Sequence, residues 1–215
     1  MKTLLFAPET LNIAETTRMI EIARACGDDF HCEFFGYGGE YEYLIGAAGF
    51  VCPLLTPQLS PPRADGMMKA DRMERGGKMF TTDEMVERVR SELDLYARIK
   101  PTAVVIGFTL STFVSARAAG VPLVSVNPFA LTGPFFQANP TMWGEMLRGT
   151  PLDWLPEGLI NRVINAWGRR TKAWTKPMNA AAKEFGVRPF TSLTDIFRGD
   201  YTLVPDIPQL TGVPE

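Results

Sequence analysis

The sequence predicts an α/β fold in which a parallel sheet carries helices on both faces. Two apolar runs, residues 102–108 and 121–126, show no apolar/polar alternation, which is typical of strands buried on both faces. The small-residue segment between them is a predicted helix, capped by Thr109 and ended by Gly120. Strand, helix and strand of this kind form a right-handed βαβ unit, and ligands bind beyond the carboxyl ends of such strands.

The first third of the chain predicts a further alternation of strands and helices. Its first helix is expected to begin at Asn12, and the spacing to Glu15 allows a capping box, in which Glu15 reaches back to the Asn12 backbone. This order is that of a Rossmann-like half-domain. The expected strands are residues 3–7, 31–35 and 50–55, and the expected second helix is residues 40–48.

Residues 56–80 carry three prolines, three glycines and no sustained periodicity, which predicts a long loop. A capping box formed by Thr81 and Glu84 then begins a helix with one apolar face. Residues 152–174 form an amphipathic helical pattern. We expect its apolar side to pack on the sheet of the domain, and the alternative is peripheral membrane contact through residues 159–174.

Composition excludes several classes of function. The 215-residue chain has a formal net charge of −2, so its overall charge does not attract it to nucleic acid. Three scattered cysteines without a CxxC motif favour a reducing, cytoplasmic location, and the single histidine predicts no metal site. No apolar stretch approaches the length of a membrane span. We expect no cofactor.

The order and spacing of several segments resemble a known family. They are TLLFAPETLN, ARACGDDFHCEF, GAAGFVCPL, KPTAVVIGFTLSTFVSARAAGVPLVSV and YTLVPDIPQL. Together they are similar to the amino-terminal, acceptor-side domain of GT-B fold glycosyltransferases, which have two facing Rossmann-like domains. The nearest group is the UDP-glycosyltransferase family with its macrolide-glycosyltransferase-like members. The resemblance implies an acceptor-binding domain over residues 1–204, and the start of an interdomain linker over residues 205–215.

Two departures from this family concern its catalytic pair. The position of the family's catalytic histidine is occupied by Asn12, and its partner aspartate falls near Gly107. An amide side chain is not basic, so Asn12 cannot take a proton from an acceptor hydroxyl, and the catalytic base is unidentified. Without a side chain at Gly107, the cleft floor is expected to be wider and uncharged. The donor-binding second domain of the family is also expected to be absent from these 215 residues.

The expected acceptor site lies where the first, fourth and fifth predicted strands end. Several candidate residues also have a purely structural interpretation. Asn12 would be a helix cap, and Glu9 and Glu15 would be solvated glutamates of a turn. Thr109 and Ser111 would be cap hydroxyls, and the aromatic residues would serve packing alone. The predicted acceptor-binding residues are Glu9, Thr10, Asn12, Gly107, Thr109, Ser111, Asn127, Phe129 and Phe135.

The resemblance implies transfer of a sugar from a nucleotide diphosphate sugar to a hydroxyl of a mostly apolar acceptor. The isolated chain is expected to be inactive because the donor would bind the second domain. Two alternatives stay open. One is a non-catalytic or split binding subunit that requires a separate donor-binding chain. The other is an epimerase-like GT-B protein that acts on a nucleotide sugar.

Overall fold

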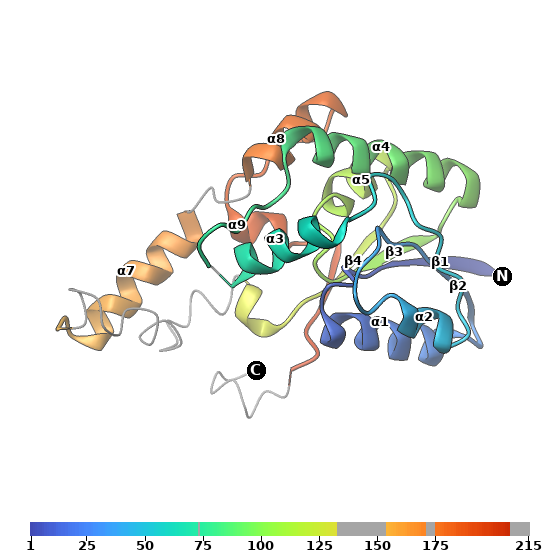
Figure 1. Ribbon diagram of the computed structural model, residues 1–215, viewed down its shortest axis with the longest axis horizontal. Coiled ribbons are helices and arrows are strands. Elements are labelled where there is room, and N and C mark those ends of the chain that lie inside the picture. The colour runs from blue at the N-terminus through green and yellow to red at the C-terminus, as the bar shows by residue number, and fades with distance from the viewer. Residues whose placement is uncertain (73, 133–153, 171–174, 207–215) are drawn as a thin grey trace.

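A parallel sheet forms the centre of the molecule. The computed structural model describes residues 1–72, 74–132, 154–170 and 175–206, and within them five parallel strands pair in the order β2-β1-β3-β4-β5 (Figure 1). The α/β class and the parallel sheet are confirmed. The strands are β1 (Lys2–Ala7), β2 (Phe30–Phe34), β3 (Ala103–Ile106), β4 (Leu123–Val126) and β5 (Tyr201–Leu203).

The strand order places a switch point beside β1. The chain passes from β1 to β2 on one side and then returns past β1 to form β3 on the other side. The register pairs Leu5 with Glu33 of β2 and with Val104 of β3. In open sheets of this order, the loops that leave the two strands at the switch point diverge and form a crevice. The functional site is therefore sought where β1 and β3 end.

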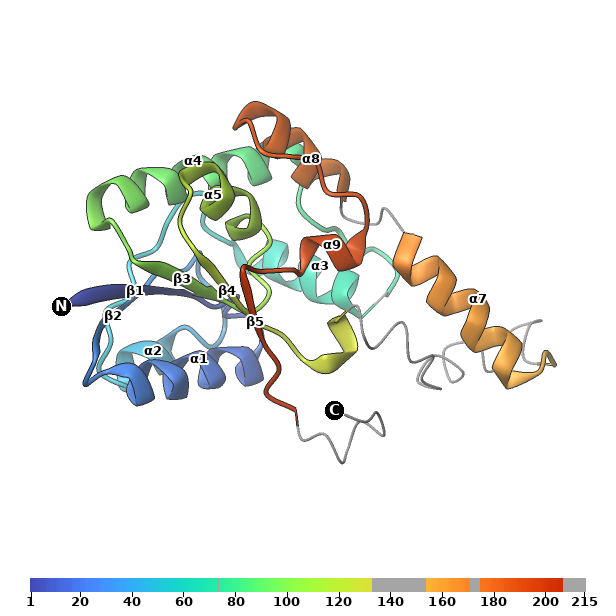
Figure 2. The ribbon, with the colours of Figure 1, turned by 180° about the vertical axis from the view of Figure 1, so that it is seen from behind.

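Helices cover both faces of the sheet, as Figures 1 and 2 show. Alternate strand residues supply the two cores: Leu5 and Val104 belong to one apolar cluster, whereas Phe6 and Val105 belong to the other. This is why the strand sequences lack apolar/polar alternation. The first cluster includes residues of α4 (Thr82–Ile99), α5 (Thr112–Ala119) and α8 (Thr175–Glu184), and the second includes residues of α1 (Ile13–Cys26) and α2 (Tyr43–Ala47).

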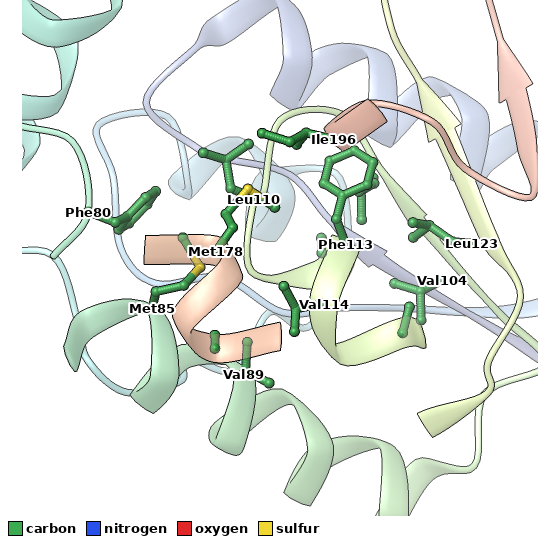
Figure 3. Packing of buried hydrophobic residues seen from close by; sticks show 14 of the residues in the cluster. Phe80, Met85, Val89, Val104, Leu110, Phe113, Val114, Leu123, Met178 and Ile196 are labelled. Atoms are coloured by element: carbon green, nitrogen blue, oxygen red, sulfur yellow. The ribbon is translucent and has the colours of Figure 1, made fainter. Parts of the chain in front are cut away.

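Figure 3 shows the larger core, in which side chains from separate elements interlock. Met85 and Val89 come from α4, and Met178 comes from α8. Phe113 of α5 is fully buried, and its ring makes an edge contact with Phe197, which follows α9 (Leu193–Ile196), at 6.0 Å between ring centroids. The last helices of the described chain are thereby tied to the central βαβ unit.

Two predictions for the segment after β2 are wrong. Residues 50–55 do not form a strand; they make only an isolated bridge between Gly36 and Leu54. The predicted loop at residues 56–80 contains α3 (Pro61–Asp71). Arg63 explains how this polar helix is held: its Nε donates to Glu84 Oε1 at 2.6 Å, and its Nη1 donates to a backbone carbonyl at Lys78 at 2.6 Å. Such tertiary contacts cannot be predicted from the spacing of apolar residues along the sequence.

The predicted helix ends have mixed outcomes. Thr81 and Glu84 form the expected capping box, and the Arg63 hydrogen bond lowers the pKa of Glu84 to about 2. Gly120 ends α5 with φ of 65°, a conformation that favours glycine. At the start of α1, Asn12 Oδ1 accepts from the Glu15 amide at 3.4 Å, as the capping box predicts, and also from the Ala14 amide at 2.9 Å. Glu15, however, does not reach back to Asn12, so the predicted capping box is incomplete.

Helix α7 (Glu157–Arg170) corrects the expectation that this segment packs on the sheet. It projects away from the sheet in both ribbon views and contacts α9. Ile160 is buried, but Leu159 and Val163 are 48% and 59% exposed. Residues 171–174, including Trp174, lie outside the described residues. None of the helices described is long and apolar enough to cross a membrane.

Replacing Phe113 should destabilise the fold strongly. Phe113→Ala leaves a cavity between α5 and Phe197, and we expect the free energy of unfolding to fall by about 3–5 kcal/mol. Urea unfolding followed by circular dichroism measures this loss. Val51→Ala is the control because Val51 is 82% exposed, so it should change the unfolding free energy little. Equal stability of the two variants would contradict the packing described above.

Candidate functional site at the ends of β1 and β3

The carboxyl group of Glu15 fills the crevice between the loops that follow β1 and β3. Its Oε1 accepts two backbone hydrogen bonds, from the amide of Glu9 at 2.8 Å and from the amide of Phe108 at 2.8 Å. Glu15 lies in the first turn of α1, so this helix delivers a carboxyl to the switch point. One side chain thus joins the two diverging loops.

Gly107 makes room for this carboxyl. A Cβ atom at Gly107 would lie 2.6 Å from Cδ and 2.6 Å from Oε1 of Glu15, which is too close for two non-bonded atoms. The position that resembles the family aspartate therefore lacks a side chain because the Glu15 carboxyl approaches it. The expectation of a wider, uncharged cleft floor is wrong, since an ionisable group occupies the space.

Burial determines the ionisation of Glu15. Desolvation raises its pKa from an ordinary value of 4.5 to about 7, although the two backbone hydrogen bonds oppose this shift. The neighbouring charge of Glu9 adds to the rise, whereas Arg18 lowers it. Glu15 can therefore hold or release a proton near neutral pH.

A buried ion pair fixes the β1 loop from the opposite side. Arg88 of α4 is fully buried, and its Nη1 donates to Glu9 Oε2 at 3.0 Å. The guanidinium lies between the rings of Tyr37 and Phe80, 3.7 and 4.4 Å from their centroids. Its Nε and Nη2 make no hydrogen bond within the described residues, and the π-faces of the two rings provide their electrostatic partners.

Glu92, one helical turn after Arg88, joins two more loops. Its Oε1 accepts from the Tyr37 hydroxyl at 2.6 Å and from the hydroxyl of Ser111, and its Oε2 accepts from Ser115. Burial raises the pKa of Glu92, and these hydroxyl donors oppose the rise. Tyr37 follows β2 and Ser111 follows β3, so α4 anchors the loops after three adjacent strands. We call the set of Glu9, Tyr37, Arg88, Glu92, Ser111 and Ser115 the α4 clamp.

Several predicted acceptor-binding side chains make internal contacts instead. The Thr109 hydroxyl donates to the Ala7 carbonyl at 2.7 Å and does not cap α5, whose N-cap residue is Ser111. Asn127 donates through Nδ2 to Ser125 and to the carbonyl of Phe197. These three polar side chains are buried and serve the fold.

The remaining predicted residues differ in their access to a ligand. Asn12 is exposed at the start of α1 and uses Oδ1 for capping. Thr10 is buried, and its hydroxyl has no hydrogen bond within the described residues. Phe129 begins the short turn η1 (Phe129–Leu131), half-buried. Phe135 lies outside the described residues.

A pocket of about 560 Å³ opens beside the β1 loop. Leu11 borders it from the β1 loop, Gly39 from the β2 loop, and α3 covers it. Its volume is in the range of sites for small organic ligands. Its lining combines apolar residues with charged ones and comprises Leu11, Gly39, Glu40, Leu59, Pro61, Ala64, Asp65, Met68 and Arg72.

Two features of the site were missed by reasoning from the sequence. The first is the pair Arg88 and Glu92, which lie on the buried side of α4 among Met85, Val89 and Tyr96. Two ionisable residues on an apolar helix face indicate buried polar contacts, and this pattern is visible in the sequence. No local pattern indicated that Glu15 points toward β3. In the described part of the chain, no group of three or more His, Cys, Asp or Glu residues could hold a metal ion.

Comparison with known proteins relates this architecture to glycosyltransferases. No protein-family model and no curated protein sequence matches the chain. Among solved structures, the spinosyn forosaminyltransferase SpnP matches 98% of this chain with a TM-score of 0.57 and 13% identity. The glycosyltransferase SnogD from Streptomyces nogalater matches 100% with a TM-score of 0.55 and 16% identity. VinC, a glycosyltransferase solved with dTDP, matches 95% with a TM-score of 0.53 and 12% identity.

The chain has the fold of one domain of a GT-B glycosyltransferase. This GT-B domain covers 47% of SpnP and 48% each of SnogD and VinC, so it spans about half the length of these proteins. The predicted fold, a Rossmann-like half of the GT-B architecture, is confirmed. At these identities the likeness defines the fold of the GT-B domain, and its function is argued from the site.

Replacing Arg88 alone should destabilise the GT-B domain more than replacing Arg88 and Glu9 together. Arg88→Met leaves the Glu9 carboxylate buried without its cation, and we expect a loss of about 3–5 kcal/mol in unfolding free energy. Adding Glu9→Gln removes the buried negative charge that has lost its cation, so the double variant should recover part of the lost unfolding free energy. Urea titrations of both single variants and the double variant measure the coupling. Additive losses would show that the two side chains do not interact.

The ionisation of Glu15 should make stability depend on pH. Because folding raises the pKa of this carboxyl from 4.5 to about 7, its contribution is fully present below pH 4.5 and is lost as pH rises through 7. Relative to Glu15→Gln, the parent should therefore lose up to about 3 kcal/mol between acidic solution and about pH 8. Unfolding free energies of both proteins across this window test the prediction. Glu21→Gln, on the exposed side of α1, is the control and should show no such trend.

Proposed function

We propose that this GT-B domain binds the acceptor in a glycosyltransferase that moves a sugar from a nucleotide diphosphate sugar to a hydroxyl of a mostly apolar acceptor. The observation that carries the proposal is the pocket of about 560 Å³ at the ends of β1 and β2, whose walls from Leu11, Leu59 and Met68 are apolar. Leu11, which lines it, directly precedes Asn12, and parallel α/β sheets bind their ligands beyond the carboxyl ends of the strands. VinC, of similar fold, was solved with dTDP, which supports a nucleotide-linked donor.

The apolar body of the acceptor would occupy this pocket, and its hydroxyl would point past Leu11 toward the start of α1. Asn12 is exposed there, and its amide NH₂ group remains available to orient the hydroxyl. Donor binding would come from a second Rossmann-like domain facing this one. A cytoplasmic location and peripheral membrane contact through residues 159–174 stay predictions.

A second candidate is a non-catalytic binding subunit. It is favoured by Asn12 and Gly107, which stand where the resembling family has its histidine and aspartate. Both candidates use the same pocket. They differ in whether sugar transfer occurs once a donor-binding domain is present, and any transfer that depends on the pocket would exclude this second candidate.

Filling the pocket should weaken acceptor binding. We expect the parent chain to bind 2-naphthol, an apolar hydroxyl compound, and Met68→Trp to weaken this binding about tenfold or more because the indole occupies the pocket. Probe fluorescence titration gives the dissociation constants. Asp71→Trp, at the exposed end of the same helix and outside the pocket lining, should bind as the parent does.

Residues 1–215 alone should transfer no sugar to this probe, because each wall of a two-domain cleft supplies groups that the other lacks. Chromatography after incubation with UDP- and dTDP-sugars detects any glycoside. Turnover by the pure chain would contradict the assignment of this domain to the acceptor side.

A further inference from the structure

We propose that Glu15 is the group that takes the proton from the acceptor hydroxyl. This inference rests on the proposed function and adds the base that neither Asn12 nor Gly107 supplies. Glu15 lies three residues after Asn12 in the first turn of α1, so both residues belong to the same helix end at the crevice. Its carboxyl occupies the space left by Gly107 between the two loops.

The hydrogen bonding of Glu15 leaves one oxygen for a ligand. Oε1 accepts from both backbone amides, which fixes the direction of the carboxyl. Oε2 has no hydrogen bond to any described residue, and it is not completely buried. The residue keeps 7% of its surface exposed. A hydroxyl that reaches Oε2 can therefore donate to it without displacing an existing contact.

The charged groups around Glu15 do not neutralise it. Glu9 faces it from the β1 loop, but Arg88 of α4 holds the Glu9 carboxylate in a separate ion pair. Arg18, on α1, acts on Glu15 only weakly. From β3, the neighbours are the Gly107 backbone and the amide of Phe108. A carboxyl without a cation partner accepts a proton more readily than an ion-paired one, and burial already holds its pKa at about 7, close to the value suited to a base at neutral pH.

The proposed step balances in atoms and charge. The acceptor oxygen forms a bond to the anomeric carbon of the sugar, while the bond between that carbon and the diphosphate oxygen breaks. The bonding electrons leave with the nucleoside diphosphate, and the acceptor proton moves to Oε2 of Glu15. Glu15 then returns this proton to solvent. Asn12 orients the hydroxyl through its amide and takes no proton.

The test follows the proton directly and does not need sugar transfer. Excited 2-naphthol is a strong acid, and when a base lies at its hydroxyl it emits as naphtholate at longer wavelength. We expect the bound probe to emit as naphtholate with the parent at about pH 8.5, and much less at about pH 5.5, where Glu15 is protonated. Glu15→Gln should bind the probe but give mainly neutral-naphthol emission at both pH values. Glu21→Gln, on the same helix, is the control and should match the parent.

A second variant covers the case in which Glu15→Gln does not fold. Gly107→Ala keeps every carboxyl, but its Cβ collides with the Glu15 carboxyl and must displace it. Bound naphtholate emission should fall in this variant as well. Equal emission from the parent and from whichever variant folds would overturn the assignment of Glu15 while leaving acceptor binding intact. No binding of the probe by the parent would overturn both this inference and the proposed function.

Discussion

The arrangement of the site depends on one turn of α4, in which two charged residues are buried among apolar ones. Arg88 holds Glu9 after β1, and Glu92 holds Tyr37 after β2 and Ser111 after β3. Burying charges costs free energy unless each finds a partner, so the three loops can adopt only positions that satisfy both side chains. Because Arg88 and Glu92 need these partners, the α4 clamp fixes the positions of the loops that follow β1, β2 and β3.

Glu15 and Gly107 form a second, complementary constraint on the other side of the β1 loop. The glycine permits the close approach, and the carboxyl accepts a hydrogen bond from one amide of each of the two diverging loops. Holding a buried carboxyl that has no cation partner makes the fold less stable above neutral pH. Proteins accept such local costs at functional sites, where a proton must be held and released.

The sequence allowed prediction of the elements whose signals are local. The uninterrupted apolar strands indicated a parallel sheet, the spacing of Thr81 and Glu84 indicated a helix start, and Gly120 indicated a helix end. It failed where tertiary contacts override weak local preference. Helix α3 has a polar, glycine-containing sequence and is held by Arg63 contacts to Glu84 and to the chain near Lys78. Residues 50–55 look like a strand but make a single bridge.

The sequence by itself determined the fold class, the central βαβ unit and the two positions that depart from the resembling family, because these follow from side-chain type and spacing along the chain. Only the tertiary structure decided which polar groups face the crevice. Thr109, Ser111 and Asn127 turn inward to satisfy buried partners, whereas Glu15 crosses from α1 to the amide of Phe108, 93 residues away in sequence. Hydrogen bonds between distant residues leave no periodic trace in a sequence, since they depend on how packed elements meet.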